Sequence, residues 1–411
     1  MTPAKTILVI GTYDTKDDEL NFLASVIRDQ GGQVLTMDVS VLGDPTAPTD
    51  YSKHDVAGEG GSSIEAAIAT GDENHAMQIM ATGAALLTTR LYNEGRFDGM
   101  IVLGGTMGTD LALDVCSALP LGVPKYIVST VSFSPLIPAE RIAADTQMIL
   151  WAGGLYGLNS VCKASLSQAA GAVLGAARAT QKPDLTKPLI GMTSLGTSAL
   201  RYMVTLKPAL EARGFEVAVF HSTGMGGRAF ESLASQGAFA CVFDFCTQEL
   251  GNFIHGSDIS AGGGRLTNAG LKGTPQLVAP GCYDLVDVVG WKDVPDKWSD
   301  HMMHEHNRLL TSIVLKNAER EAVAKAHCEQ LATAKGPLAV LLPTHGFGEW
   351  DRVGADLHDK EGLEVFLAAF KAEMPANADV HMIDAHINDT AFADKALEIF
   401  DGWCADGKIT R

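Results

Sequence analysis

Short apolar runs recur along the chain, and each is followed by a polar or glycine-rich loop and then by residues with helical spacing. Four such runs are Thr6–Ile10, Asp98–Leu103, Pro188–Met192 and Pro337–Leu342. Continuous apolar runs of this length are typical of parallel strands that helices cover on both faces. The alternation of strand and helix predicts an α/β protein with two doubly wound, Rossmann-like subdomains and mostly parallel sheets.

The length of the chain and one proline-containing segment indicate where the subdomains divide. A chain of 411 residues exceeds what one hydrophobic core ordinarily supports and suits two domains of roughly 200 residues each. The segment around Pro183 and Pro188 is poor in apolar residues, as linkers between domains often are. We therefore expect an N-terminal nucleotide-binding subdomain over 1–181, a linker over 182–187 and a C-terminal subdomain over 188–411.

Charge and hydropathy argue against two classes of partner. The net charge of −18 disfavours nucleic acid, because a surface that follows phosphates needs clustered Lys and Arg. No apolar run reaches the roughly 18 to 20 residues that span a bilayer, and no signal-peptide pattern is present. We therefore expect a cytoplasmic protein without a membrane partner. The seven cysteines include no CxxC pair, which favours reduced thiols.

Two loops of the first half follow apolar strands and precede helices, where ligands of parallel sheets bind. The candidate cofactor-binding residues are Gly11, Thr12, Asp14, Thr15, Lys16, Gly104, Gly105, Thr106, Gly108 and Thr109. Lys16 could meet a phosphate as a point charge, and Asp14 could hold Mg²⁺. Alternatively, Thr15 or Asp14 caps the following helix and Lys16 is solvated. Neither loop fits the P-loop or the dinucleotide fingerprint.

A third loop, His221–Glu231, is glycine-rich and lies between the strand pattern of Val217–Phe220 and a helix that opens over Ala229–Leu233. Backbone amides at such a loop can hold an anion with the help of the helix dipole. The candidate substrate-binding residues are Thr223, Gly224, Gly226, Gly227, Arg228 and Arg265. Two alternatives stay open: a plain tight turn, and structural ion pairs of the arginines with Asp244 or Asp351.

Histidines and carboxylates of the second half supply candidate catalytic groups. These are His221, Asp244, His345 and Asp351, with His221 as the candidate general base. A site that combines arginines and carboxylates can bind an anionic substrate and move a proton. A separate group, His301, His304 and His306, falls in a predicted helix over 301–333. His301 and His304 would lie one turn apart there, which could bind zinc, although a solvated helix face or a domain-interface cluster is the favoured interpretation.

Four motifs of the chain match those of a known family, namely Gly11–Lys16, Gly122–Thr130, Phe220–Ser232 and Gly281–Asp287. They resemble the Tm-1-like ATP-binding family, an uncharacterised family that includes the amino-terminal domain of a plant tobamovirus-resistance protein. The resemblance extends over essentially the whole chain and is loose around 131–146 and 344–351. It implies two Rossmann-like subdomains, ATP with Mg²⁺ as ligand, and a homodimer. It also implies that a separate barrel protein resembling phosphoenolpyruvate-utilising enzymes could be a partner.

Residues and resemblance together lead to one functional expectation and two alternatives. We expect an ATP-binding enzyme that acts on a small organic acid, with its ligand in the cleft between the subdomains. The nucleotide phosphates would lie on the two loops of the first half, and a small anion would lie near His221, Arg228 and Arg265. The alternatives are a nucleotide-gated regulatory protein without turnover, and a carbon–carbon lyase or hydrolase that needs no nucleotide.

Overall fold

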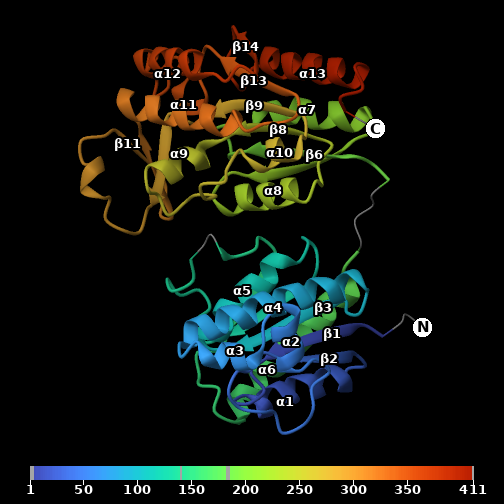
Figure 1. Ribbon diagram of the computed structural model, residues 1–411. Helices are drawn as coiled ribbons and strands as arrows, with labels where there is room; N and C mark the ends of the chain where they lie inside the picture. The colour runs from blue at the N-terminus through green and yellow to red at the C-terminus, as the bar shows by residue number, and fades with distance from the viewer. Residues whose placement is uncertain (1–3, 139–140, 182–185, 410–411) are drawn as a thin grey trace. The chain divides into compact units, whose positions relative to one another are not determined.

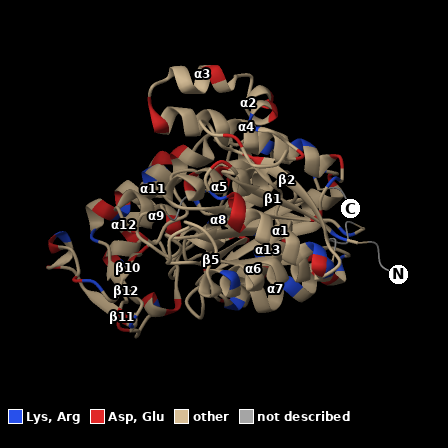
Figure 2. Ribbon diagram, turned by 90° about the horizontal axis from the view of Figure 1, so that it is seen from below, with Lys and Arg blue, Asp and Glu red and all other residues tan. Residues whose placement is uncertain are grey.

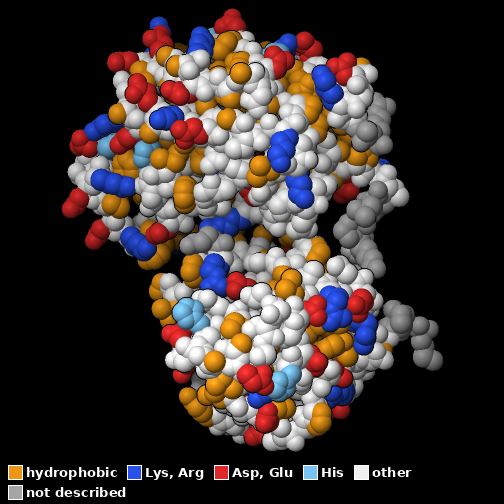
Figure 3. All heavy atoms as spheres, in the orientation of Figure 1, with side chains coloured by type: hydrophobic (Ala, Val, Ile, Leu, Met, Phe, Trp, Pro, Cys, Tyr) orange, Lys and Arg blue, Asp and Glu red, His pale blue; other side chains and the backbone are white. Residues whose placement is uncertain are grey.

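The computed structural model describes residues 4–138, 141–181 and 186–409. The chain divides into two compact units, 1–183 and 184–411, whose elements are labelled in Figure 1. The division falls within the predicted linker of 182–187, of which residues 182–185 lie outside the described residues. Acidic and basic residues are scattered over the helices (Figure 2), and charged and apolar side chains mix over the visible surface of each unit (Figure 3).

The first unit contains a parallel five-stranded sheet with the order β2-β1-β3-β4-β5. Its strands are β1 (Thr6–Gly11), β2 (Gln33–Asp38), β3 (Gly99–Gly104), β4 (Lys125–Ser129) and β5 (Thr146–Leu150). Alternate residues of a strand face opposite sides of a sheet. Accordingly, Ile7 and Val9 pack into one core, and Leu8 and Ile10 pack into another. The apolar run is therefore buried on both sides, as the sequence predicted.

Helices cover both faces of this sheet. They are α1 (Asp17–Asp29), α2 (Lys53–Glu59), α3 (Ile64–Ala69), α4 (Glu73–Asn93), α5 (Thr106–Ala118) and α6 (Ser160–Ala179). The helices α1 and α6 contribute to the core that contains Ile7 and Val9. The helices α2, α3, α4 and α5 contribute to the opposite core. This arrangement is the doubly wound fold that the sequence predicted.

The second unit contains a parallel six-stranded sheet with the order β14-β13-β9-β8-β6-β7. Its strands are β6 (Leu189–Ser194), β7 (Glu216–His221), β8 (Cys241–Cys246), β9 (Gln276–Gly281), β13 (Leu338–Pro343) and β14 (Asp379–Ile383). One face packs against α7 (Arg201–Ala212) and α13 (Thr390–Ala405). The other packs against α8 (Met225–Ser235), α9 (Gln248–Ile254), α10 (Asn268–Lys272), α11 (Asn317–Leu331) and α12 (Lys360–Glu373).

A small antiparallel sheet interrupts the second unit and corrects one prediction. It consists of β10 (Leu285–Val289), β12 (Leu310–Val314) and β11 (Met303–Asn307), in that order across the sheet. The predicted helix over 301–333 is therefore wrong in its first half. The Asn307 side chain accepts hydrogen bonds from the amides of Leu309 and Leu310, which fixes the turn between the strands. Thr311, Ile313 and Val314 are β-branched and favour a strand.

Several further elements differ from the sequence prediction. The expected loop over 43–61 contains α2, whose capping box pairs the Ser52 and Asp55 side chains with backbone amides. The helix expected from Gly153 begins at Ser160 instead, because Asn159 caps it. The half-buried edge strand β5 and the short 3₁₀ turns Asp296–Trp298 and Glu349–Asp351 were not predicted. None of the helices that the structure describes is long and apolar enough to cross a bilayer.

Candidate functional site

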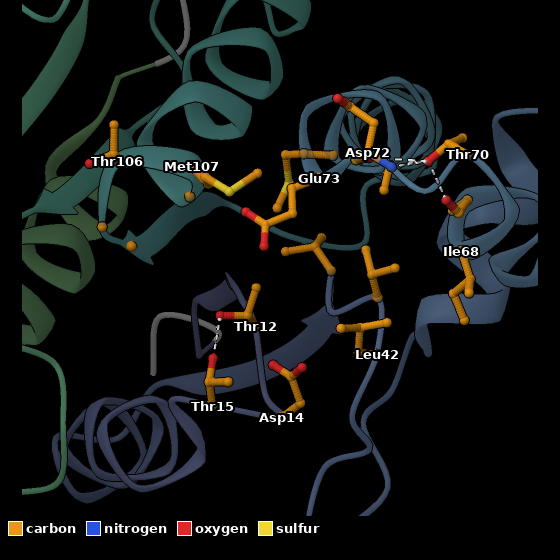
Figure 4. A pocket seen from close by; sticks show the side chains of 18 of the residues that line it. Thr12, Asp14, Thr15, Leu42, Ile68, Thr70, Asp72, Glu73, Thr106 and Met107 are labelled. Carbon is orange, nitrogen blue, oxygen red and sulfur yellow. Dashed lines mark hydrogen bonds between the residues drawn. The ribbon is translucent and has the colours of Figure 1, made fainter.

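The two predicted cofactor loops of the first unit open onto one pocket of about 630 Å³, shown in Figure 4. Eight of the ten predicted residues line it, namely Thr12, Asp14, Thr15, Lys16, Gly104, Gly105, Thr106 and Gly108. The pocket continues along the loop after β2 and the segment that joins α3 to α4. The sequence therefore identified two of the pocket's walls, and it missed the apolar wall that includes Leu42, Ile68 and Met77.

Sheet topology explains why these loops diverge around a pocket. The neighbours β1 and β3 lie side by side in the sheet. The chain leaves β1 through α1 on one face, and it leaves β3 through α5 on the other. The position between β1 and β3 is therefore a topological switch point, because the two connections go to opposite faces of the sheet. The two loops diverge there and leave a crevice beyond the carboxyl ends of the strands, where open α/β sheets bind ligands.

The N-terminus of α5 forms one wall of the pocket. Gly105 is the N-cap residue, and no side chain caps the helix. Thr106, Met107 and Gly108 of its first turn line the pocket, so the positive end of the dipole faces it. Gly104 is required by close packing, because a Cβ there would lie 2.6 Å from the Gly108 Cα. The wall thus presents backbone donors to a ligand.

Two predicted cofactor residues serve the fold instead. Thr109 is buried, and its hydroxyl lies 2.7 Å from the Gly105 carbonyl oxygen and 2.6 Å from the Ser129 hydroxyl. Gly11 ends β1 below the pocket, where a Cβ would lie 2.7 Å from a Leu20 methyl carbon. Both positions are corrections to the predicted cofactor set, since neither residue lines the pocket.

Asp14 and Lys16 form the opposite wall. No side chain caps α1, so the alternative in which Thr15 or Asp14 caps this helix is wrong. Lys16 is partly buried, and its Nζ lies 3.1 Å from the Thr15 hydroxyl. One Asp14 carboxylate oxygen accepts a hydrogen bond from the Gly43 amide at 3.2 Å. The other is buried and has no partner among the described residues.

Acidic side chains dominate the charge of the pocket. Asp14, Asp72 and Glu73 line it together with the single cation Lys16. The Asp72 carboxylate is partly engaged within the fold, because it accepts a hydrogen bond from the His75 amide at 2.7 Å and caps α4. The Glu73 carboxylate reaches into the pocket (Figure 4). A phosphate group would be repelled here unless a divalent cation offset the carboxylates.

In the second unit, the glycine-rich loop after β7 already holds an anion that belongs to the chain. One carboxylate oxygen of Glu249 accepts hydrogen bonds from the Gly224 amide at 2.6 Å and the Gly227 amide at 3.0 Å. A Cβ on Gly227 would lie 1.9 Å from this carboxylate, and one on Gly226 would lie 1.8 Å from the His221 carbonyl oxygen. All three glycines were predicted to bind substrate. In the structure, Gly224 and Gly227 bind Glu249, and Gly226 packs against the backbone of His221.

Arg265 and Asp244 form the centre of a buried ion cluster. Arg265 donates to Asp244 at 2.5 and 2.7 Å, to Glu249 at 2.9 Å and to Glu231 at 3.3 Å. The Arg265 side chain is fully buried, and Asp244 is nearly so. Burial raises the pKa of Glu231 and of Glu249, while Arg265 opposes the rise. The ion-pair alternative is confirmed for Arg265 with Asp244. Both side chains are committed to this cluster, so the structure gives no support to the predicted substrate-binding role of Arg265 or catalytic role of Asp244.

The other predicted residues of this unit do not converge on one centre. Arg228 donates to the Ser260 carbonyl oxygen at 2.9 Å. His345 is exposed and pairs with Asp384 at 3.0 Å. Asp351 accepts hydrogen bonds from the Phe347 and Gly348 amides and lies 3.0 Å from the His386 ring nitrogen. Its role is to shape its own loop, because all of these contacts are local to that loop or its neighbour.

His221 and Thr223 are the predicted residues of this unit that line a cavity, which they share with Gln248 and Asp287. No sequence pattern marks Gln248 or Asp287, because a glutamine at a helix start and an aspartate in a strand are ordinary features.

The histidines of 301–306 do not form the zinc site that a helix would allow. His301 lies 3.0 Å from Glu319, and His304 and His306 lie on β11 beside the Trp350 ring. Within the described ranges, no group of three or more His, Cys, Asp or Glu side chains could hold a metal ion.

Solved structures resemble this chain only weakly. A Streptomyces glycosyltransferase, SsfS6 complexed with thymidine diphosphate, matches 95% of this chain and 99% of its own at 14% identity, with a TM-score of 0.18. MurG of Acinetobacter baumannii matches 91% of this chain and 96% of its own at 13% identity, with a TM-score of 0.20. Similarities of this size carry no argument about activity.

Sequence comparisons give a consistent result over the whole chain. A UPF0261 protein of Brucella melitensis is 51% identical over 410 residues, which is 100% of this chain and 98% of that protein. The ToMV resistance protein Tm-1 of Solanum lycopersicum is 28% identical over 96% of this chain and 55% of its own length. Models of the N-terminal and C-terminal domains of an uncharacterised family match residues 5–182 and 187–404. The chain therefore belongs to the uncharacterised protein family UPF0261 and is a relative of the Tm-1 proteins.

Proposed function

We propose that the first unit binds ATP together with Mg²⁺ in the pocket between the loops after β1 and β3. One observation carries the proposal: both loops at the switch point of the sheet open onto the same 630 Å³ pocket. A pocket of several hundred Å³ with an apolar wall and a few polar groups is typical of small-ligand sites. The uncapped N-terminus of α5 would face the phosphates.

The residues present fit Mg²⁺ as well as the nucleotide. The buried Asp14 oxygen that lacks a partner among the described residues is a hard oxygen ligand, which Mg²⁺ prefers. Mg²⁺ supplies charge that offsets the carboxylates and phosphates when it is bound. Lys16 would then contact phosphate oxygens, and Leu42, Ile68 and Met77 would cover the base. We therefore expect ATP affinity to depend on Mg²⁺.

A Lys16→Ala variant tests the phosphate assignment. A hydrogen bond to a charged group contributes about 1.5–3 kcal/mol, so ATP·Mg²⁺ should bind roughly 10-fold to 100-fold more weakly. Isothermal titration calorimetry measures the change, and EDTA should abolish binding to the unaltered protein. Lys163→Ala is the matched control, because Lys163 is exposed on α6 and does not line the pocket. Unchanged affinity in Lys16→Ala would refute the phosphate assignment.

The proposal extends to a cytoplasmic homodimer that uses ATP on a small organic acid, in line with the family resemblance. Separate measurements test the enzymatic activity and the oligomeric state. Incubation of the protein with ATP and organic acids should release ADP or AMP, and light scattering should give twice the mass of 43.4 kDa. Tight nucleotide binding without any turnover would instead support a regulatory protein.

A further inference from the structure

A small cavity in the second unit is lined by polar groups that the ion cluster around Arg265 does not use. It has a volume of about 60 Å³ and lies where the loops after β6, β7 and β8 meet the small antiparallel sheet. Gln248 and Asp287 line it and are almost completely buried. His221 and His306 also line it and are exposed, so they lie at the rim.

Gln248 is the first residue of α9 and lies at the bottom of the cavity. Its side chain is fully buried, yet neither amide atom has a hydrogen-bond partner among the described residues. Buried amides are nearly always hydrogen-bonded, because an unmade hydrogen bond costs free energy. A side chain that brings both a donor and an acceptor into a cavity therefore indicates a ligand that supplies the complementary groups.

Asp287 on β10 lies beside this amide. Its Oδ1 accepts a hydrogen bond from the Ser312 hydroxyl at 2.6 Å, and its amide donates to Asn252 at 2.9 Å, so the residue is held firmly. Its Oδ2 has no hydrogen-bond partner among the described residues. Burial raises the pKa of Asp287, while the hydrogen bond from the Ser312 hydroxyl and the Gln248 amide, which lies within hydrogen-bonding reach of Asp287, oppose the rise. If the Gln248 amide nitrogen turned towards Asp287, its Oε1 would still need a donor.

The unsatisfied atoms define the chemistry of the ligand. Asp287 Oδ2 and Gln248 Oε1 need donors, and Gln248 Nε2 needs an acceptor. A hydroxyl group donates and accepts at once, whereas an ammonium group has no acceptor and an ionised carboxylate or phosphate has no donor. Two adjacent hydroxyl groups would serve all three atoms.

The walls and the size of the cavity agree with such a ligand. Trp350 lines one side, and an aromatic ring suits the C–H face of a polyol. A volume of about 60 Å³ holds only part of a molecule, since one water occupies about 30 Å³ in the liquid. The rest of the ligand would extend out of the cavity past His221 and His306.

We propose that this cavity of the second unit binds the diol end of a small polyhydroxylated molecule, a polyol or a hydroxy acid with two adjacent hydroxyl groups. The lining residues all belong to the second unit, so the site does not rest on nucleotide binding by the first. The sequence predicted a small anion near His221, Arg228 and Arg265. The proposed ligand would lie beside His221 and Thr223 and away from Arg265.

Calorimetry with simple probes on the full chain tests the ligand class. Glycerol and D-glycerate carry two adjacent hydroxyl groups, lactate carries one and propionate carries none. We expect D-glycerate to bind at least tenfold more tightly than lactate, and propionate not to bind. Equal affinities for D-glycerate and propionate would overturn the proposal. So would a crystal soaked in D-glycerate that holds only an ordered water beside Gln248.

Two near-isosteric variants test the residues. We expect Gln248→Met and Asp287→Asn each to weaken D-glycerate binding at least tenfold. Asp258→Asn, an exposed carboxylate that pairs with Lys292, is the control and should bind as the unaltered protein does.

A stability measurement separates binding from a structural role. Because Gln248 has no partner in the folded protein among the described residues, Gln248→Met should keep or raise the melting temperature. A lower melting temperature would show that the amide serves the fold, and unchanged D-glycerate affinity in both variants would show that neither residue binds. Either result would overturn the proposal.

Discussion

At the scale of single residues, two backbone amides of the glycine-rich loop hold the buried carboxylate of Glu249. The loop around Gly224 and Gly227 has the glycines of an anion site, and an anion does lie there. That anion is Glu249, about twenty residues further along the chain. A carboxylate of the chain and a carboxylate of a substrate make the same demands on backbone amides, so loop composition does not distinguish them.

Replacement of Arg265 tests the buried cluster. Arg265→Met would leave Asp244, Glu231 and Glu249 buried without their cation. Removing one partner of a buried ion pair typically costs about 3–5 kcal/mol. Urea unfolding should show a loss in this range. Arg201→Ala is the control, because its exposed pair with Glu349 should contribute less than about 1 kcal/mol. Similar losses for both variants would mean that the cluster does not stabilise the fold.

His327 makes stability depend on pH on the acid side. Burial lowers its pKa to about 3 in the folded protein, against about 6.5 in an unfolded chain. Between these values the unfolded chain binds a proton that the folded protein does not. Stability should therefore fall as the pH drops below 6.5, by up to about 1.4 kcal/mol per pH unit. His327→Phe should flatten the urea-derived stability between pH 6.5 and 4.5. The exposed control His345→Gln should keep the slope, and an unchanged slope in His327→Phe would contradict the assignment.

At the scale of elements, most strands that the sequence predicted have apolar side chains on both faces, such as β1, β3 and β13. The missed strands β5 and β11 are partly exposed and mix polar with apolar residues. The missed strands β10 and β12 are buried, but Asp287 and the pair Thr311 and Ser312 interrupt their apolar runs. His301 and His304 fitted a helical spacing by chance, although only His304 lies on β11. The pocket of the first unit could be predicted in part, because loops that follow strands can be located from the sequence. Its apolar wall comes from the loop after β2 and from α3 and α4, whose placement depends on tertiary packing.

The start of α8 provides an element-scale prediction. A Cβ on Gly227 would overlap the Glu249 carboxylate, so Gly227→Ala should displace it and disrupt the helix start. We expect a loss of at least about 2 kcal/mol, the scale of a buried polar group left without its partners. Gly402→Ala is the matched control, because nothing lies within 4 Å of a Cβ there. Alanine within a helix should stabilise the protein by about 0.5–1 kcal/mol. Chemical denaturation measures both variants, and a stable Gly227→Ala would disprove the packing argument.

At the scale of the whole molecule, each unit has its own cores. The four larger hydrophobic clusters each draw their residues from one unit only. The family models divide the chain at nearly the same place. A ligand that binds one unit should therefore stabilise that unit through its own loops, because a ligand protects the structure to which it binds.

Hydrogen exchange with two ligands tests this separation on the full chain. ATP·Mg²⁺ at about one hundred times its dissociation constant adds about 2.7 kcal/mol to the state that binds it. Exchange should then slow in peptides that cover Gly11–Lys16 and Gly104–Thr109, and should stay unchanged over His221–Glu231. D-glycerate should slow exchange around its own cavity, in peptides that cover His221–Thr223, Gln248 and Asp287, and should leave the first unit unchanged. Protection of His221–Glu231 by ATP would contradict the proposed nucleotide site. It would mean that a phosphate displaces Glu249 from the amides of Gly224 and Gly227, and that the glycine-rich loop is the nucleotide site after all.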